Sequence, residues 1–204
     1  MKMNSDIEKM LKDVVKRVPA SRPLLQCVHF ENGDAVVTDS HRLIKVKDIA
    51  PKDLKLDLNL ADFSFPDVEY PDTNRLIPSS FSTTLVLDKL RVVEMLPYLK
   101  AMAKGYSDKR RIIRLETSDT NLRISRSDRK SQGSQVLNIK PRRASGSAVG
   151  ISCDSQFLAE ALEALTNIKD TRILTLTMKF NSKLTPFLIS AGNVDYLVTP
   201  VKAF

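Results

Sequence analysis

The stretch LLQCVHFENGDAVVTDSHRLIKV (residues 24–46) holds two β-rich runs, LLQCVHF and AVVTD followed by HRLIKV, on either side of Glu31-Asn32-Gly33-Asp34. Asn-Gly between two such runs is a strong signal of a tight hairpin turn, because both residues accept positive φ angles. The stretch therefore predicts two strands joined by a β-hairpin.

An amphipathic helix is predicted just before this hairpin, with Ser5 or Asn4 as its cap and an end before Pro19. Its apolar residues recur at helical spacing, and the other faces are mainly basic. The apolar positions are Ile7, Met10, Leu11, Val14, Val15 and Val18, and the basic ones are Lys9, Lys12, Lys16 and Arg17. The first unit is thus a helix followed by strands.

The same order of elements occurs twice more. A second helix is expected from near Leu87, with Pro97 either kinking it or marking its first turn, and IIRLETSDTNLRISR (112–126) then supplies two strands. The third helix, FLAEALEALTNI (157–168), is capped by Asp154. It precedes the strands RILTLTMKF, TPFLIS and YLVTPV. Three helix-plus-strands repeats indicate an α+β fold.

Two segments stand outside the repeats. Residues 47–81 contain four prolines and predict one strand, LKLDLNL, within an extended connector. Residues 131–150 predict one strand, QVLNI, followed by an exposed loop. Neither segment has the pattern of an independent domain.

The net charge of +8 over 204 residues favours a polyanionic partner such as DNA, RNA or an anionic membrane. Positive charge is concentrated in residues 109–114, 123–130 and 140–143, although such runs are more often solvated faces. The two cysteines, Cys27 and Cys153, lack metal-site spacing and are expected to be buried thiols. With no signal peptide or apolar membrane span in the sequence, a cytoplasmic protein is expected.

The cluster Asp39-Ser40-His41 suggests catalysis, but its spacing argues against it. A catalytic triad holds a nucleophile and a base together, whereas adjacent residues in an extended segment point to opposite faces. No metal cluster, glycine-rich phosphate loop or paired-carboxylate motif accompanies it. We therefore expect no enzyme activity, no catalytic residue, no cofactor and no metal.

Seven local motifs, taken in order, resemble one family. They are RPLLQCVHFENG, TDSHRL, YPDTNRLIP, RIIRLET, ISCDSQFLAEALEAL, LTPFLIS and YLVTPVKAF. Together they are similar to the bacterial DNA polymerase III beta subunit, the sliding clamp. The resemblance implies a DNA clamp fold of three half-domain repeats, with a shortened middle domain and connector at 1–80 and the last domain at 81–204. The family's first domain and half of its middle domain have no counterpart here.

The resemblance also implies a pocket for short peptide motifs, typically a Gln followed by hydrophobic residues ending in Leu-Phe. The deep apolar part would use Leu25, Thr38, Leu43, Pro71, Leu76, Leu197 and Thr199. A polar wall would use Ser40, His41, Arg42 and Arg75. The shallower part would use Asp154, Phe157, Leu184, Pro186, Val198, Pro200, Val201 and Lys202. Thr199 and Asp154 depart from the residues common in the family, which implies an altered motif preference.

Family clamps line their ring with basic helices, so the resemblance suggests DNA contacts from Lys9, Lys12, Lys16, Arg17, Lys89, Lys100 and Lys104. The third helix instead offers Glu160 and Glu163. The expected function is a clamp-like replication accessory protein of a bacterium, phage or mobile element, which binds polymerase, clamp loader or repair proteins and double-stranded DNA. The alternatives are a decoy or inhibitor of a host clamp, or a basic DNA-binding protein on a clamp scaffold. A homo-oligomer or contact with a host clamp is open.

Overall fold

The computed structural model describes residues 5–66, 69–104, 111–127 and 133–202. Its helices are α1 (Ser5–Val15), α2 (Lys89–Lys104) and α3 (Ser155–Thr166), with short 3₁₀ turns η1 (Pro23–Gln26) and η2 (Asn74–Leu76). Its strands are β1 (Cys27–Glu31), β2 (Asp34–Thr38), β3 (Arg42–Val46), β4 (Leu56–Asn59), β5 (Thr83–Asp88), β6 (Ile112–Thr117), β7 (Leu122–Ser127), β8 (Ser134–Ile139), β9 (Arg143–Gly146), β10 (Gly150–Asp154), β11 (Thr175–Phe180), β12 (Phe187–Ala191) and β13 (Val194–Val198). None of the described helices is long and apolar enough to cross a membrane.

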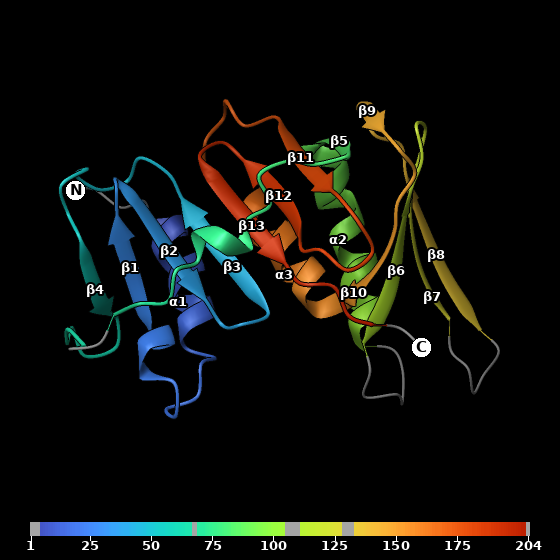
Figure 1. Cartoon of the computed structure of the whole chain (residues 1–204). Helices are drawn as coiled ribbons and strands as arrows, with labels where there is room; N and C mark the ends of the chain where they lie inside the picture. The colour runs from blue at the N-terminus through green and yellow to red at the C-terminus, as the bar shows by residue number, and fades with distance from the viewer. Residues whose placement is uncertain (1–4, 67–68, 105–110, 128–132, 203–204) are drawn as a thin grey trace.

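The strands form two antiparallel sheets (Figure 1). The larger sheet has nine strands in the order β4-β1-β2-β3-β13-β12-β11-β5-β9, and the smaller has four in the order β10-β6-β7-β8. Helices α2 and α3 pack against each other, and each of them contacts both sheets, whereas α1 packs on β1 and β2. All three helices therefore cover the same face of the larger sheet.

The three units contribute the consecutive strands β1–β3, β6–β8 and β11–β13. A fourth strand pairs beside each set: β4 beside β1, β10 beside β6 and β5 beside β11. In the two units after residue 81 the added strands are β5 and β10, which lead directly into α2 and α3. In the first unit the added strand is β4, which comes from the connector and pairs with β1 through Phe30↔Leu56 and Cys27↔Asn59. The connector therefore supplies the outer strand of the first unit.

Local signals in the sequence explain most of these elements. The predicted hairpin is confirmed, with Asn32 at φ 53° and Gly33 at φ 90° between β1 and β2. The predicted apolar stripe of α1 is buried, from Ile7 to Val15, and Asp154 caps α3 by accepting a 2.7 Å hydrogen bond from the Gln156 amide. Removing such apolar side chains from water contributes roughly 1.5–3 kcal/mol each.

Two details of the prediction are resolved or corrected. Helix α2 runs through Pro97 to Lys104, and Pro97 lies on its exposed side, where the missing backbone hydrogen bond faces solvent. The loop expected after QVLNI is wrong, because Arg143–Gly146 forms β9 and pairs with β5. Gly146 has φ 98°, and a Cβ there would lie 1.9 Å from the Ser82 carbonyl oxygen, so only glycine fits this close approach.

Candidate functional site

A row of side chains crosses the larger sheet where the first unit meets the third. Thr38 pairs with Leu43 in β3, Leu43 with Leu197 in β13, and Leu197 with Leu188 in β12. Directly opposed residues in antiparallel strands lie on the same face. Val36, Leu43, Leu188 and Leu197 form a cluster separate from the main core, hereafter the apolar row. Adjacent Ile44 belongs instead to the main core, so the apolar row lies on the face away from the helices.

The segment after the connector crosses this face. Ile77 and Phe81 pack against the apolar row, and in Figure 1 the chain around η2 passes in front of β3 and β13, while the helices lie behind. Leu76 is 50% exposed beside Ile77, and Leu184 is 56% exposed in the turn between β11 and β12. Exposed leucines next to a buried apolar floor are typical of a docking site for hydrophobic side chains.

The motif TDSHRL forms a tight turn between β2 and β3. Asp39 accepts hydrogen bonds from the backbone amides of His41 (3.0 Å) and Arg42 (2.9 Å) through Oδ1. The Thr38 hydroxyl donates to the Arg42 carbonyl at 2.7 Å. Ser40 has φ 75°, and its Oγ accepts a hydrogen bond from Arg22. The aspartate therefore holds backbone in place, and within the described residues it does not orient the His41 ring.

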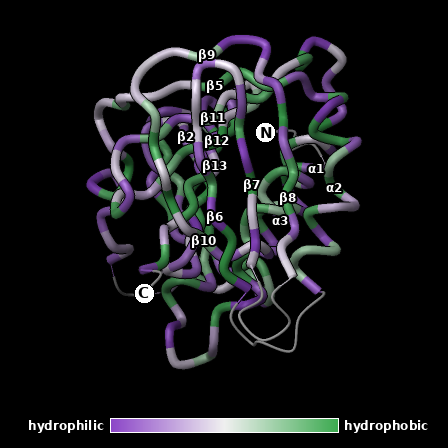
Figure 2. Tube along the Cα trace, turned by 90° about the vertical axis from the view of Figure 1, so that its right-hand side faces the viewer, coloured by the Kyte–Doolittle hydropathy of each residue, from purple (hydrophilic) through white to green (hydrophobic). Residues whose placement is uncertain are grey.

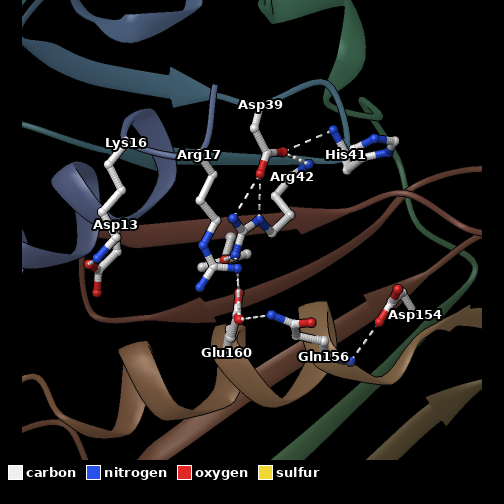
Figure 3. A network of polar contacts seen from close by, with 10 residues as sticks. Asp13, Lys16, Arg17, Asp39, His41, Arg42, Asp154, Gln156 and Glu160 are labelled. Atoms are coloured by element: carbon white, nitrogen blue, oxygen red, sulfur yellow. Dashed lines mark hydrogen bonds and ion pairs between the residues drawn. The ribbon is translucent and has the colours of Figure 1, made fainter. Parts of the chain in front are cut away.

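Arg42 leaves this turn on the helix side of the sheet and is almost fully buried, with a side chain 3% exposed (Figure 3). Its guanidinium donates to Asp39 Oδ2 from Nε at 2.9 Å and from Nη2 at 2.7 Å, and it forms an ion pair with Glu160 of α3. It also donates to the Tyr196 hydroxyl at 3.2 Å. Arg42 thus ties β3 of the first unit to α3 and β13 of the third.

Phe157 of α3 completes this junction. The Arg42 guanidinium lies 4.9 Å from its ring centroid, and the His41 ring stacks on the same phenyl ring at 5.6 Å. The His41 carbonyl accepts hydrogen bonds from the Thr199 amide (3.0 Å) and hydroxyl (2.9 Å). The end of the chain after β13 is held in turn by the Val201 amide, which donates to the Ser152 carbonyl.

The predicted pocket residues fall into three groups. Thr38, Leu43 and Leu197 lie in register on the outer face, and Leu76 precedes the segment that packs there. The residues in loops, turns and 3₁₀ segments outside the strands are Leu25, Ser40, His41, Pro71, Arg75, Leu184, Pro186, Thr199, Pro200, Val201 and Lys202. The residues directed to the main core or to the helix side are Arg42, Asp154, Phe157 and Val198.

Sequence reasoning did not select Val36, Leu188, Ile77 or Phe81. For Val36 a signal was present, because it lies two positions before Thr38 on the same face of β2. Leu188 pairs directly with Leu197, which only the register between β12 and β13 shows. For Ile77 and Phe81 there was no such signal, since both lie in a segment without regular periodicity. Their position depends on how the connector returns across the sheet.

Most of the predicted DNA-contacting cations are engaged within the protein. Arg17 bonds both carboxylate oxygens of Glu160 at 2.8 Å, Lys100 pairs with Glu163 at 2.6 Å, and Lys12 with Glu8 at 2.6 Å. Lys16 pairs with Asp13, and Lys89 donates to the Ile168 carbonyl. Lys9 and Lys104 form no ion pair with any described residue. The groove between α1 and α3, about 480 Å³, is therefore lined by charges of both signs.

Within the described ranges, no group of three or more His, Cys, Asp or Glu side chains is arranged to hold a metal ion. Both cysteines are free and buried, as expected, and burial raises the pKa of each thiol. These thiols are poor nucleophiles in the folded chain.

This architecture is that of the DNA sliding clamps: half a clamp domain joined edge to edge to a complete one. The sliding clamp of Bacillus subtilis matches 97% of this chain and 62% of its own, with a TM-score of 0.76 and 20% identity. The griselimycin-bound clamp of Bartonella birtlesii matches 96% of this chain and 64% of its own, with a TM-score of 0.74 and 17% identity.

Curated relatives agree with the solved structures. The beta sliding clamp of Streptococcus pneumoniae is 23% identical over 252 residues, which cover 95% of this chain and 63% of that protein. That of Synechococcus elongatus is 28% identical over 140 residues, 67% of this chain and 35% of the relative. No protein-family model matches the chain. The chain is thus similar to the beta sliding clamps along nearly its whole length, as its motifs indicated, and it has a shortened form of their fold.

Part of the difference in length between this chain and its relatives lies inside the aligned region. The alignment with the Streptococcus pneumoniae clamp spans 252 residues, more than the 204 of this chain, so the relative contains internal segments without a counterpart here. The chain spans 63% of the length of that relative. Among the described residues, 1–80 contain one helix, α1, whereas 81–204 contain two, α2 and α3.

Proposed function

We propose that this chain is a clamp-like accessory protein of DNA replication or repair that binds short hydrophobic peptide motifs of its partners. The observation that carries the proposal is the apolar row, which continues in register from β3 into β13. Two exposed leucines lie on the segments that lead to it: Leu76 next to Ile77, and Leu184 in the turn before β12. The apolar row lies at the boundary of the two proposed domains, 1–80 and 81–204. Residues of both parts contribute to it, Leu43 from the first and Leu188 and Leu197 from the second.

The chemistry of this surface favours a hydrophobic peptide over a small polar ligand. The apolar row consists of aliphatic side chains, and Ile77 and Phe81 pack against it. Cationic groups stand at its border, since Arg75 is 86% exposed at the side chain and Lys179 lies 5.8 Å from the Phe81 ring centroid. Apolar anchors in a groove with a few polar groups at the rim are the usual form of peptide recognition.

The sliding clamp of Bartonella birtlesii binds griselimycin, and a ligand site on a clamp of similar fold supports a ligand site here. Arg42, Asp39 and Glu160 take a different role in this proposal. Because Arg42 is buried on the opposite side of the sheet, it fixes the angle between β3 and α3 instead of contacting the peptide.

The proposal is tested by titrating a labelled Gln-x-x-Leu-Phe-type peptide into the protein. Replacing both Leu76 and Leu184 by alanine removes exposed apolar groups without opening a core cavity. A loss of roughly 1.4 kcal/mol weakens Kd about tenfold, and we expect at least that change. Leu174→Ala is the matched control, because Leu174 is 66% exposed at the far end of β11. Absence of saturable binding, or equal binding by all variants, contradicts the proposal.

DNA contact through the helices is the second, weaker part of the proposal. The net charge of +8 supports it, whereas the ion pairs of Lys12, Lys16, Arg17 and Lys100 reduce the positive charge available on that face. Lys9→Ala together with Lys104→Ala is expected to lower duplex affinity at low salt and to flatten its salt dependence. If both substitutions together leave the affinity for duplex DNA unchanged, the helix face does not contact DNA.

A further inference from the structure

The outer face of the larger sheet continues beyond the apolar row as a line of polar side chains. Lys179 of β11 is opposite Leu188 of β12. On the other side of Lys179 come Thr84 of β5 and then Ser145 of β9. Directly opposed residues lie on the same face, so this line extends the apolar row across the sheet. Figure 2 shows β9, β5, β11 and β12 following one another in this order.

A second line of residues runs beside the first on the same face. Thr177 of β11 is opposite Val86 of β5, and Val86 is opposite Arg143 of β9. Each of the three lies two positions from a member of the first line, so all three point outward. Lys183 is exposed in the turn between β11 and β12. The polar members of this surface, hereafter the basic sheet face, are Thr84, Arg143, Ser145, Thr177, Lys179 and Lys183.

The cations of the basic sheet face are not neutralised by the protein. Arg143, Lys179 and Lys183 form no ion pair with any residue that the structure describes. Among residues 83–88, 143–146 and 175–191, which supply this part of the sheet, the only acidic side chain is Asp88. It pairs with Arg142 at 3.3 Å. The basic sheet face therefore carries a net positive charge that is open to solvent.

The helix side of the sheet has the opposite arrangement. Four of its cations are held in ion pairs with carboxylates of the same chain: Lys12, Lys16, Arg17 and Lys100. An anion that approaches the helices has to compete with these carboxylates, whereas an anion that approaches the basic sheet face does not. Because the chain carries a net charge of +8, a polyanion is attracted to it as a whole and meets uncompensated cations on the outer face.

The side chains of the basic sheet face suit a phosphate backbone. Arg, Lys, Ser and Thr are among the residues that contact phosphates in protein–DNA complexes, and these contacts carry no base sequence. The bases of single strands are instead bound by stacking on aromatic side chains. In β5, β9 and β11 the only aromatic residue is Phe180, which is buried in the main core. This composition favours the backbone of a duplex over the bases of a single strand.

We propose that duplex DNA binds through its phosphates to the basic sheet face, independently of base sequence and at a site separate from the helix side. Lys179 and Arg143 would pair with phosphate oxygens. The hydroxyls of Thr84 and Ser145, which make no hydrogen bond to any described residue, would donate to phosphate oxygens as well. The basic sheet face adjoins the apolar row, so a partner docked on that row and a bound duplex would be neighbours. The proposal goes beyond peptide binding and does not depend on it.

The test measures binding of a labelled duplex of mixed sequence by fluorescence anisotropy over a series of salt concentrations. The test variant carries Arg143→Gln, Lys179→Gln and Lys183→Gln. The control variant loses the same charge at three exposed cations outside the basic sheet face, through Lys52→Gln, Arg111→Gln and Lys140→Gln. None of the six side chains is buried, so folding should be retained, and far-UV circular dichroism checks this.

The salt dependence separates the two variants. Each neutralised phosphate contributes about 0.9 to the slope of log K against log salt, so the test variant should lose about 2–3 of that slope. Its affinity at low salt should fall roughly tenfold or more, whereas the control variant should keep the wild-type slope. A wild type without saturable duplex binding, equal losses in the two variants, or tighter binding of a single strand than of the duplex would overturn the proposal.

An acidic polypeptide is the rival ligand for a positive surface. Poly-glutamate, added at the same concentration of charge as unlabelled duplex, should displace the labelled duplex much less effectively. Equal displacement by poly-glutamate would overturn the proposal and assign the basic sheet face to an acidic peptide. The peptide titration described under the proposed function is a separate measurement, so either proposal can fail while the other stands.

Discussion

Replacing Arg42 by alanine should destabilise the fold more than any substitution at an exposed basic residue. Arg42 is buried between the first and third units, where it donates to Asp39 and Tyr196, pairs with Glu160 and lies over Phe157. Truncation removes all of these contacts at once. It also leaves the Asp39 and Glu160 carboxylates without their shared cation.

The size of the expected loss of stability depends on the contacts that the Asp39 and Glu160 carboxylates retain after Arg42 is removed. Breaking a buried ion pair costs about 3–5 kcal/mol, because the remaining charge is left without a partner. Asp39 is 9% exposed but still accepts two backbone hydrogen bonds, and Glu160 is 22% exposed and still binds Arg17 and Gln156. These remaining contacts place the expected loss near the lower limit, about 3 kcal/mol.

Urea unfolding followed by far-UV circular dichroism measures this loss, since the chain has no tryptophan. With a urea m-value of about 2 kcal/mol/M, the midpoint should fall by roughly 1.5 M. Arg75→Ala is the matched control, because Arg75 is 86% exposed at the side chain, and its midpoint should change little. A double-mutant cycle with Glu160→Ala should give a coupling of about 1 kcal/mol or more. A loss below about 1 kcal/mol for Arg42→Ala would refute the view that it joins the two units.

Three further predictions concern the backbone, a helix cap and pH. Gly146→Ala should cost about 1–3 kcal/mol, because of its φ of 98° and the contact with the Ser82 carbonyl, and hydrogen exchange should show β9 losing protection first. Asp154→Ala should lower the urea-derived stability by about 1 kcal/mol through loss of the cap on Gln156, and an unchanged midpoint would contradict this. Burial raises the pKa of Tyr196 to about 12 and raises that of Tyr70, so the folded chain binds more protons above pH ~10 than the unfolded chain. Stability should therefore be intact below that pH and fall as pH rises towards 12, and phenolate absorbance should show two tyrosines that ionise late.

Local signals in the sequence were sufficient for the hairpin, the three helices and most strands. Asn32-Gly33 and the apolar spacing of Ile7 to Val15 act within a few residues, so they can be interpreted without the rest of the fold. β9 was missed because RASG has no apolar alternation, and its pairing with β5 is far away in sequence. The role of β4 as an outer strand was missed for the same reason, since LKLDLNL shows a strand but not its neighbour.

The candidate site shows the same division between local and long-range information. Motif resemblance selected Thr38, Leu43 and Leu197, and the register between β3 and β13 brings them into one row. It also selected Arg42, whose neighbouring position in β3 puts its side chain on the other face, where it meets Glu160. The pairing of Arg17 with Glu160 and of Lys100 with Glu163 was not visible in the sequence, because both partners come from α3.

The most direct test of the account is a methyl NMR titration with a Gln-x-x-Leu-Phe-type peptide. Leu43 and Ile44 are neighbours in β3, but they lie on opposite faces of the sheet, in the apolar row and the main core respectively. The account predicts saturable shifts of Leu43, Leu188, Leu197 and Ile77, with Ile44 and Val37 nearly unchanged. Shifts confined to Ile44, Val37 and the helix side, or no saturable shift on the outer face, would contradict it.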